Sequence, residues 1–205
     1  MENREGDPPA AAAIQHPLNQ AQQQELLTLA RQAIRSYLEQ KQLPEAPIST
    51  PRLQQKAGVF VTLRTRWQPG LPHDEAARLR GCIGHVAADV PLSTLVPVIA
   101  VKAAVRDPRF AAVTAVELLK LRLEISILSP LTPVTDIETI ELGVHGLAIV
   151  SDDKRGLLLP QVPSMFGWTR PEYLAAICRK AGLPPSAWQS AELLAFTTQT
   201  FVEAD

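Results

Sequence analysis

The sequence predicts an α+β protein with an antiparallel or mixed sheet and flanking helices. Helical and strand periodicities both occur along the 205 residues. They follow one another as helix, hairpin, helix, strand, hairpin, helix and strand, without the regular β-α-β alternation that parallel sheets require. The composition, with 46% hydrophobic and 20% charged residues, suits a sizeable core and argues against disorder.

The beginning of the chain differs from the rest. Residues 1–17 contain prolines and an alanine run but no sustained periodicity, so we expect a disordered leader followed by one domain over 18–205. From Asn19, a suitable N-cap, apolar residues recur at helical spacing as far as Gln40 and Lys41. This pattern predicts the first helix.

A hairpin and a second helix are expected next. Residues 59–66 are β-rich and precede Gln68-Pro69-Gly70, which is typical of a turn, so residues 78–86 should return as the partner strand. Residues 92–105 are predominantly apolar. They predict a helix packed in the core, with Pro97 in its first turns.

The remaining chain predicts short strands and helices. Thr114 and Glu117 have the spacing of a capping box, and residues 121–128 alternate apolar and polar side chains, as in a strand with one buried face. The further elements expected are a hairpin of 146–150 with 156–159, a helix over 173–180 that starts near Thr169, and a final strand over 196–202.

The charge balance argues against several partners. With 20 Lys and Arg against 21 Asp and Glu, the net charge is -1, which provides no basic surface for nucleic acid or an anionic membrane. No apolar run reaches the ~20 residues of a membrane span, and no signal-peptide pattern is present, so a cytoplasmic location is expected. Cys82 and Cys178 are therefore expected to be thiols.

The sharpest chemical feature is the segment Leu79-Arg80-Gly81-Cys82-Ile83-Gly84. Gly81 and Gly84 allow a sharp turn or a close approach of a ligand, with positive φ accessible at both. Arg80 and the N–H groups of such a loop would lower the pKa of the Cys82 thiol and bind an oxyanion, as a nucleophile requires. The alternative is structural: Cys82 is a small buried side chain in a strand, with the glycines at a bulge.

A nucleophilic cysteine needs a base, and two residues are candidates. His145, between Gly143 and Gly146, has the side chain whose ordinary pKa lies nearest neutrality, or it is a loop histidine satisfied by backbone. Glu124 would orient that histidine as a third catalytic residue, or it is an ordinary solvated strand residue.

Neither a metal nor a cofactor is predicted. Cys82 and His85 have the spacing of some zinc ligands, but no second pair completes a set of four. A catalytic metal site would have to be built from Cys82, His85, His145 or Glu124.

A charged turn is expected after the second helix. Pro108 ends that helix within the segment Asp107-Pro108-Arg109-Phe110. Its opposite charges around a rigid proline either clamp a ligand or tie the loop to the core.

Several blocks follow the cysteine segment in a characteristic order. They are Arg106-Asp107-Pro108-Arg109-Phe110, Leu123-Glu124-Ile125-Ser126-Ile127-Leu128, His145-Gly146-Leu147, Gly156-Leu157-Leu158-Leu159-Pro160-Gln161-Val162 and Lys180-Ala181-Gly182-Leu183-Pro184, with Trp188 after them. Together with the cysteine hexapeptide, these blocks resemble the AMMECR-one family. The resemblance covers roughly Leu18 to Val202.

The resemblance implies a two-lobed α+β fold, with both termini in the larger lobe and the cysteine motif near a cleft between the lobes. Bacterial relatives are associated with a Memo-like protein and a radical S-adenosylmethionine protein, so a shared pathway or complex is implied. Some relatives have Asp where this chain has His145. The residues that match family motif positions are Arg80, Gly81, Cys82, Gly84, Asp107, Arg109, Phe110 and Glu124.

Two functions of different classes follow as hypotheses. The first is a binding or accessory protein whose cleft grips a small molecule or peptide, with catalysis belonging to the Memo-like or radical partner. The second is an enzyme in which Cys82 attacks such a substrate, Arg80 holds an anionic group, and His145 or Glu124 moves protons. A depressed thiol pKa would indicate the enzyme, and a buried neutral thiol the binding protein.

Overall fold

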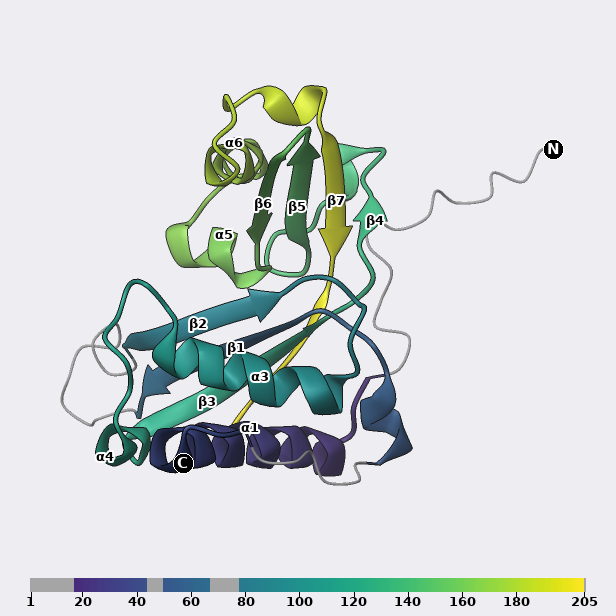
Figure 1. Cartoon of the computed structure of the whole chain (residues 1–205). Coiled ribbons are helices and arrows are strands. Elements are labelled where there is room, and N and C mark those ends of the chain that lie inside the picture. The colour runs from purple at the N-terminus through teal and green to yellow at the C-terminus, as the bar shows by residue number, and fades with distance from the viewer. Residues whose placement is uncertain (1–16, 44–49, 67–77, 205) are drawn as a thin grey trace. The chain divides into compact units, whose positions relative to one another are not determined.

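The computed structural model describes residues 17–43, 50–66 and 78–204, and the chain divides into two compact units (Figure 1). The larger unit takes in the described residues up to Ile127 and those from Gln199 onward, and the smaller takes in Leu128–Thr198. Each unit has a four-stranded sheet and a hydrophobic core of its own. The α+β class is thereby confirmed, whereas a cleft between the lobes stays a prediction. The expected leader, residues 1–17, lies outside the described residues except for Pro17.

The larger unit is built on a sheet with the strand order β2-β1-β3-β8, in which β1 runs antiparallel to both β2 and β3. The predicted hairpin of 59–66 with 78–86 is confirmed, and the turn expected at 68–70 lies outside the described residues. The elements of this unit, in chain order, are α1 (Gln20–Gln40), the 3-10 turn η1 (Pro51–Gln54), β1 (Val59–Thr65), β2 (Leu79–His85), α3 (Leu92–Val105), α4 (Ala115–Leu118), β3 (Leu121–Leu128) and β8 (Thr198–Val202).

One face of this sheet is apolar and covered by helices. Val59, Val61 and Leu63 on β1 are fully buried and belong to one cluster with side chains of α1 and α3. These two helices pack against each other, and α3 also contacts β1 and β2 (Figure 1). Because successive strand residues point to opposite faces, the residues between these three point away from the helices.

Local sequence signals place the helix ends where they are predicted. The Asn19 side chain accepts a hydrogen bond from the Gln22 backbone N–H over 3.0 Å, and the Gln22 side chain accepts one from the Asn19 N–H over 3.0 Å. At the start of α4, the Thr114 hydroxyl accepts from the Glu117 N–H over 3.2 Å. Both caps join atoms only three residues apart, so sequence suffices to find them. None of the helices in the described ranges has the length and apolar character that a membrane span needs.

The smaller unit has the strand order β4-β7-β5-β6, with antiparallel pairing throughout. Helix α6 starts at a capping box between Thr169 and Glu172 and stops before Gly182, whose φ is 69°. The predicted hairpin and helix of this unit are confirmed. Its elements are β4 (Thr132–Pro133), η2 (Ile137–Thr139), β5 (Gly146–Ser151), β6 (Lys154–Leu158), α5 (Gln161–Phe166), α6 (Arg170–Lys180), η3 (Ala187–Gln189) and β7 (Glu192–Phe196).

Two elements differ from the sequence-based expectation. The final strand expected over 196–202 is present as β8, but it is preceded by β7, a strand of the other sheet that was not expected. A continuous β-rich run does not reveal where the chain changes sheet. The proline-rich stretch from Pro160 predicts only an irregular end to the hairpin, yet it begins helix α5, with Pro163 in the first turn. Proline is tolerated there because the first N–H groups of a helix have no partner within it.

The contact between α3 and β2 depends on a glycine. A Cβ atom on Gly81 would overlap the backbone carbonyl oxygen of Ala103 on α3, so the helix backbone lies directly against the strand. A Cβ atom on Gly84 would instead overlap the Phe60 ring. Neither glycine has a positive φ. Of the two interpretations of the cysteine segment, the strand is the one observed and the tight loop is not. These glycines are needed because larger side chains would not fit.

Replacement of the two glycines by alanine is expected to have unequal effects. For Gly81→Ala, we expect the free energy of unfolding to fall by about 2–3 kcal/mol, because helix backbone must move. For Gly84→Ala, we expect about 1 kcal/mol or less, because the half-buried Phe60 ring can turn aside. Urea denaturation of the two variants measures both losses. Equal losses would contradict the proposed close approach of α3.

Candidate functional site

Thr62, Cys82 and Glu124 form a row across the sheet of the larger unit. Thr62 on β1 is paired with Cys82 on β2 and with Glu124 on β3. Directly paired residues point to the same face of a sheet, and here that face is turned away from α1 and α3. Sequence reasoning names Cys82 and Glu124 but misses Thr62, because strand register is decided by tertiary pairing.

The Cys82 thiol is free, partly buried and hydrogen bonded. The Thr62 hydroxyl donates to the Cys82 Sγ over 3.2 Å. Burial raises the pKa of the Cys82 thiol above its ordinary value, although the Thr62 hydrogen bond and the positive charge of Arg109 lower it in part. This direction agrees with the buried neutral thiol, the alternative to the depressed pKa that a nucleophile requires.

Asp107 and Arg109 hold the backbone of Cys82 from outside the sheet. Strand β2 is an edge strand, so its outward N–H and C=O groups need partners. The Cys82 N–H donates to Asp107 Oδ2 over 2.8 Å, and Arg109 Nη2 donates to the Cys82 carbonyl oxygen over 3.3 Å. The segment 107–109 thus takes the place of a neighbouring strand. Of its two predicted roles, the tie between a loop and the core is the one observed.

The two charged groups of this clamp also bind each other. Arg109 Nε and Nη2 donate to the two carboxylate oxygens of Asp107 over 2.9 and 2.7 Å. The Asp107 side chain is 2% exposed and the Arg109 side chain 54%. The guanidinium group of Arg109 holds the pKa of Asp107 far below its usual range, helped by the Cys82 N–H. Asp107 is therefore a buried carboxylate that accepts hydrogen bonds from the Cys82 backbone and from Arg109.

Arg80 lies apart from the thiol because of a bulge. The register of β2 on β1 shifts between Leu63 and Arg64, which pair with Gly81 and Leu79, so Arg80 is the extra residue. Its Nη2 donates to Glu117 Oε2 over 3.0 Å, its Nε also bonds that carboxylate, and its Cζ lies 5.8 Å from the centre of the Phe110 ring. The expectation that Arg80 lowers the pKa of Cys82 is wrong. Arg109 is the arginine that does so.

The two candidate bases have other partners. Glu124 Oε2 lies 3.8 Å from Arg64 Nε. His145 belongs to the smaller unit, where it is buried and its Nδ1 accepts from the Glu141 N–H over 3.0 Å. The Tyr173 hydroxyl donates to the His145 carbonyl oxygen over 3.2 Å. His145 is thus satisfied by backbone as the second interpretation of the sequence expects, and catalytic roles for His145 and Glu124 remain predictions.

The side chains of the described residues do not form a cluster that could bind a metal ion. Over 17–43, 50–66 and 78–204, no three His, Cys, Asp or Glu side chains gather as ligands would. His85, whose spacing from Cys82 resembles that of zinc ligands, instead has its Nε2 2.7 Å from Asp89 Oδ1.

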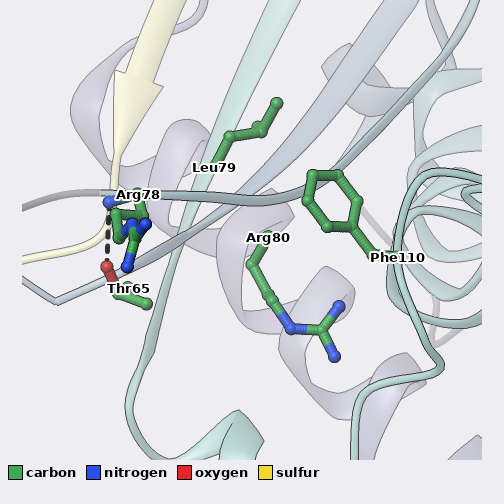
Figure 2. A pocket seen from close by; sticks show the side chains of 5 residues that line it. All are labelled: Thr65, Arg78, Leu79, Arg80 and Phe110. Atoms are coloured by element: carbon green, nitrogen blue, oxygen red, sulfur yellow. Dashed lines mark hydrogen bonds between the residues drawn. The ribbon is translucent and has the colours of Figure 1, made fainter. Parts of the chain in front are cut away.

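A hollow of about 540 Å³ opens beside the bulge and is lined by Thr65, Arg78, Leu79, Arg80 and Phe110. Figure 2 shows Arg78 next to Thr65 on one side and Arg80 next to Phe110 on the other. Sequence reasoning singles out Arg80 and Phe110 because both match family motif positions. It misses Arg78 and Thr65, since only the pairing of β1 with β2 brings them to the same place.

Comparison with known proteins decides the family. Residues 27–201 match the family model described as AMMECR1. The chain belongs to the AMMECR1 family. The resemblance seen in the sequence motifs is thereby confirmed, and the matched range contains Cys82, the 107–110 segment and Glu124.

Similar AMMECR1 proteins span nearly the same length. Protein MK0488 of Methanopyrus kandleri is 41% identical over 190 residues, which are 88% of this chain and 87% of that protein. Protein TK0174 of Thermococcus kodakarensis is 41% identical over 186 residues, 87% of this chain and 88% of that one. The crystal structure of uncharacterized protein PH0010 from Pyrococcus horikoshii matches with a TM-score of 0.82 and 38% identity, covering 91% of this chain and 93% of that chain. The crystal structure of this relative therefore has the same α+β fold.

The clamp on this AMMECR1 chain predicts a pH dependence of stability. Because the folded pKa of Asp107 is lowered, its ionised form stabilises the fold above the unfolded pKa of ~3.9, and this contribution is lost as the pH falls toward the folded pKa. We expect Asp107→Asn to lower the free energy of unfolding by about 1–3 kcal/mol at neutral pH. The difference from wild type should shrink below about pH 4.

Chemical denaturation between about pH 3 and pH 8 measures this difference. Asp153→Asn is a matched control, because Asp153 is exposed in the turn between β5 and β6. It should change stability little at any pH. A loss for Asp107→Asn that stays constant down to the acid limit would show that the charge of Asp107 is not the stabilising feature.

Proposed function

We propose that this AMMECR1 chain is a binding or accessory protein that works with a Memo-like protein and a radical S-adenosylmethionine protein. The setting of Cys82 is the observation that supports a binding role. A nucleophilic cysteine needs a group that accepts its proton. The described hydrogen-bond partner of the Cys82 sulfur is the Thr62 hydroxyl, which acts as a donor.

The rigidity of the backbone at Cys82 also supports a binding role. The Cys82 N–H and C=O groups are held by Asp107 and Arg109, and the backbone of α3 lies against Gly81. Groups that are already ordered lose little conformational entropy when a ligand binds. A rigid strand of this kind is better suited to recognising a partner or small molecule than to the movements of a catalytic loop.

A cysteine-dependent enzyme is the second candidate, and one observation favours it. The Thr62 hydrogen bond and the Arg109 charge both stabilise the Cys82 thiolate, although burial outweighs them. A substrate that completed the site with a base would allow Cys82 to attack a small molecule or peptide. The two candidates differ in the pKa of the free thiol.

Alkylation of Cys82 distinguishes the two functions. In a Cys178→Ala background, we expect the iodoacetamide rate to rise about tenfold per pH unit through neutrality, without a plateau below the ~8.5 of an ordinary cysteine. Thr62→Val should slow the reaction further, because it removes a bond that lowers the thiol pKa. In the wild type, Cys178 is fully buried and should react only after denaturation. A plateau near neutral pH would favour the enzyme.

The partner proposal is tested by direct titration. The full chain is added to a purified Memo-like protein and to a purified radical S-adenosylmethionine protein from the same organism, with binding followed by calorimetry. We expect a saturable complex that Cys82→Ser changes by less than about threefold, or ~0.7 kcal/mol. Absence of binding to both proteins would refute the accessory role, and loss of binding in Cys82→Ser would show that the thiol itself is required.

A further inference from the structure

The hollow beside the bulge of β2 combines positive charge with apolar surface. Arg78 and Arg80 lie on either side of it, and Leu79 and Phe110 supply apolar walls (Figure 2). Leu79, Arg80 and Phe110 are half-buried, and Arg78 is exposed. A volume of about 540 Å³ is in the range of pockets that hold one small molecule, ~300–1,000 Å³.

Arg80 is rigidly placed and only partly satisfied. Its Nε and Nη2 are bonded to the Glu117 carboxylate, which fixes the plane of the guanidinium group. Its Nη1 is buried and has no hydrogen-bond partner among the described residues. A buried donor without a partner is costly and uncommon in folded proteins, so this end of Arg80 is the place where an acceptor is missing.

Arg78 supplies a positive charge at the rim of the hollow. Its backbone N–H donates to the Thr65 hydroxyl over 2.9 Å, which anchors the residue at the rim. Within the part of the chain that the structure describes, its guanidinium group has no ion-pair partner. The nearby Arg80 and Arg109 are paired with Glu117 and Asp107, so among these three arginines Arg78 is the one whose charge no described carboxylate compensates.

Phe110 gives the hollow an aromatic wall with a defined electrostatic character. The Cζ atoms of Arg80 and Arg109 lie 5.8 and 5.4 Å from the centre of its ring. These cation-π contacts restrain the ring. A restrained ring beside Leu79 can stack against a flat or apolar group without a further loss of freedom.

We propose that this hollow binds a small molecule that carries an oxyanion, a carboxylate or a phosphate, on a planar or apolar body. The oxyanion lies beside Arg78, whose guanidinium group can bind either anion through paired hydrogen bonds, and Arg80 adds positive charge on the other side. The planar or apolar part lies against Phe110 and Leu79. This inference rests on the proposed binding function and names the class of its ligand.

Two aromatic anions and two simpler molecules test the proposal. Phenyl phosphate, benzoate, inorganic phosphate and benzyl alcohol are titrated into the ¹⁵N-labelled full chain, and amide chemical shifts are followed by NMR. We expect phenyl phosphate or benzoate to give saturable shifts at Thr65, Leu79 and Phe110, and to bind about tenfold more tightly than inorganic phosphate or benzyl alcohol. The tighter of the two aromatic anions identifies the oxyanion.

Variants of the lining residues connect binding to the proposed contacts. Arg78→Gln should weaken binding of the tighter aromatic anion about tenfold. Arg78→Lys should weaken it less, because lysine keeps the positive charge but lacks the paired donors of the guanidinium group. Arg155→Gln, at an exposed arginine on β6, is the matched control and should have no effect. Phe110→Leu should reduce the advantage of the aromatic anion over inorganic phosphate. Arg78 is exposed, so its variants should fold normally.

The outcomes separate this inference from the accessory role. Unsaturable shifts for both aromatic anions, or equal affinities in Arg78→Gln and Arg155→Gln, would overturn the ligand class. Equal affinity for inorganic phosphate and phenyl phosphate would overturn the apolar half of the proposal. The same preparation is titrated with the Memo-like protein, so retained partner binding without anion binding leaves the accessory role standing and rejects this inference alone.

Discussion

The close approach of α3 to β2 at Gly81 is the constraint on which the site depends. The Ala103 carbonyl oxygen occupies the space that a side chain at Gly81 would need. Helix α3 ends two residues later, at Val105, so the chain leaves the helix beside the edge strand. Asp107 then reaches the Cys82 N–H. A larger residue at Gly81 would push the helix away, and the clamp on the strand edge would lose its geometry.

Burial is the main reason why a cysteine flanked by charged residues is not an activated thiol. The Asp107 carboxylate and the Arg109 guanidinium are hydrogen bonded to each other and to the Cys82 backbone. Arg109 stabilises the thiolate, but Asp107 and Glu124 oppose it, and burial raises the thiol pKa most. The charge of Arg109 is therefore not enough to activate the thiol, because burial and the two carboxylates act against it. The paired charges of segment 107–109 instead bind the outer backbone groups of β2 at Cys82 and stabilise this edge of the sheet.

The bulge of β2 separates two surfaces that one motif would otherwise combine. Cys82 points with Thr62 to the open face of the sheet, while Arg80 pairs with Glu117 and lines the hollow with Phe110. Without the extra residue, Arg80 and Cys82 would share a face, because residues two apart in a strand do. The bulge thus leaves a neutral thiol in one place and a cationic, partly aromatic hollow in another. This arrangement favours recognition over nucleophilic catalysis by the same residues.

Features that depend on neighbours along the chain could be predicted from the residues alone. Helix caps at Asn19 and Thr169, the hairpin of 146–150 with 156–159 and the alternation of β3 all follow from contacts a few residues long, and the motif blocks identify the family. Three features needed the folded chain: the edge position of the cysteine strand, the action of Thr62 and Arg109 rather than Arg80 on the thiol, and the assignment of β7 and β8 to different sheets. Strand register, bulges and burial arise from residues far apart in sequence, so the pKa of Cys82 could not be read from the residues beside it.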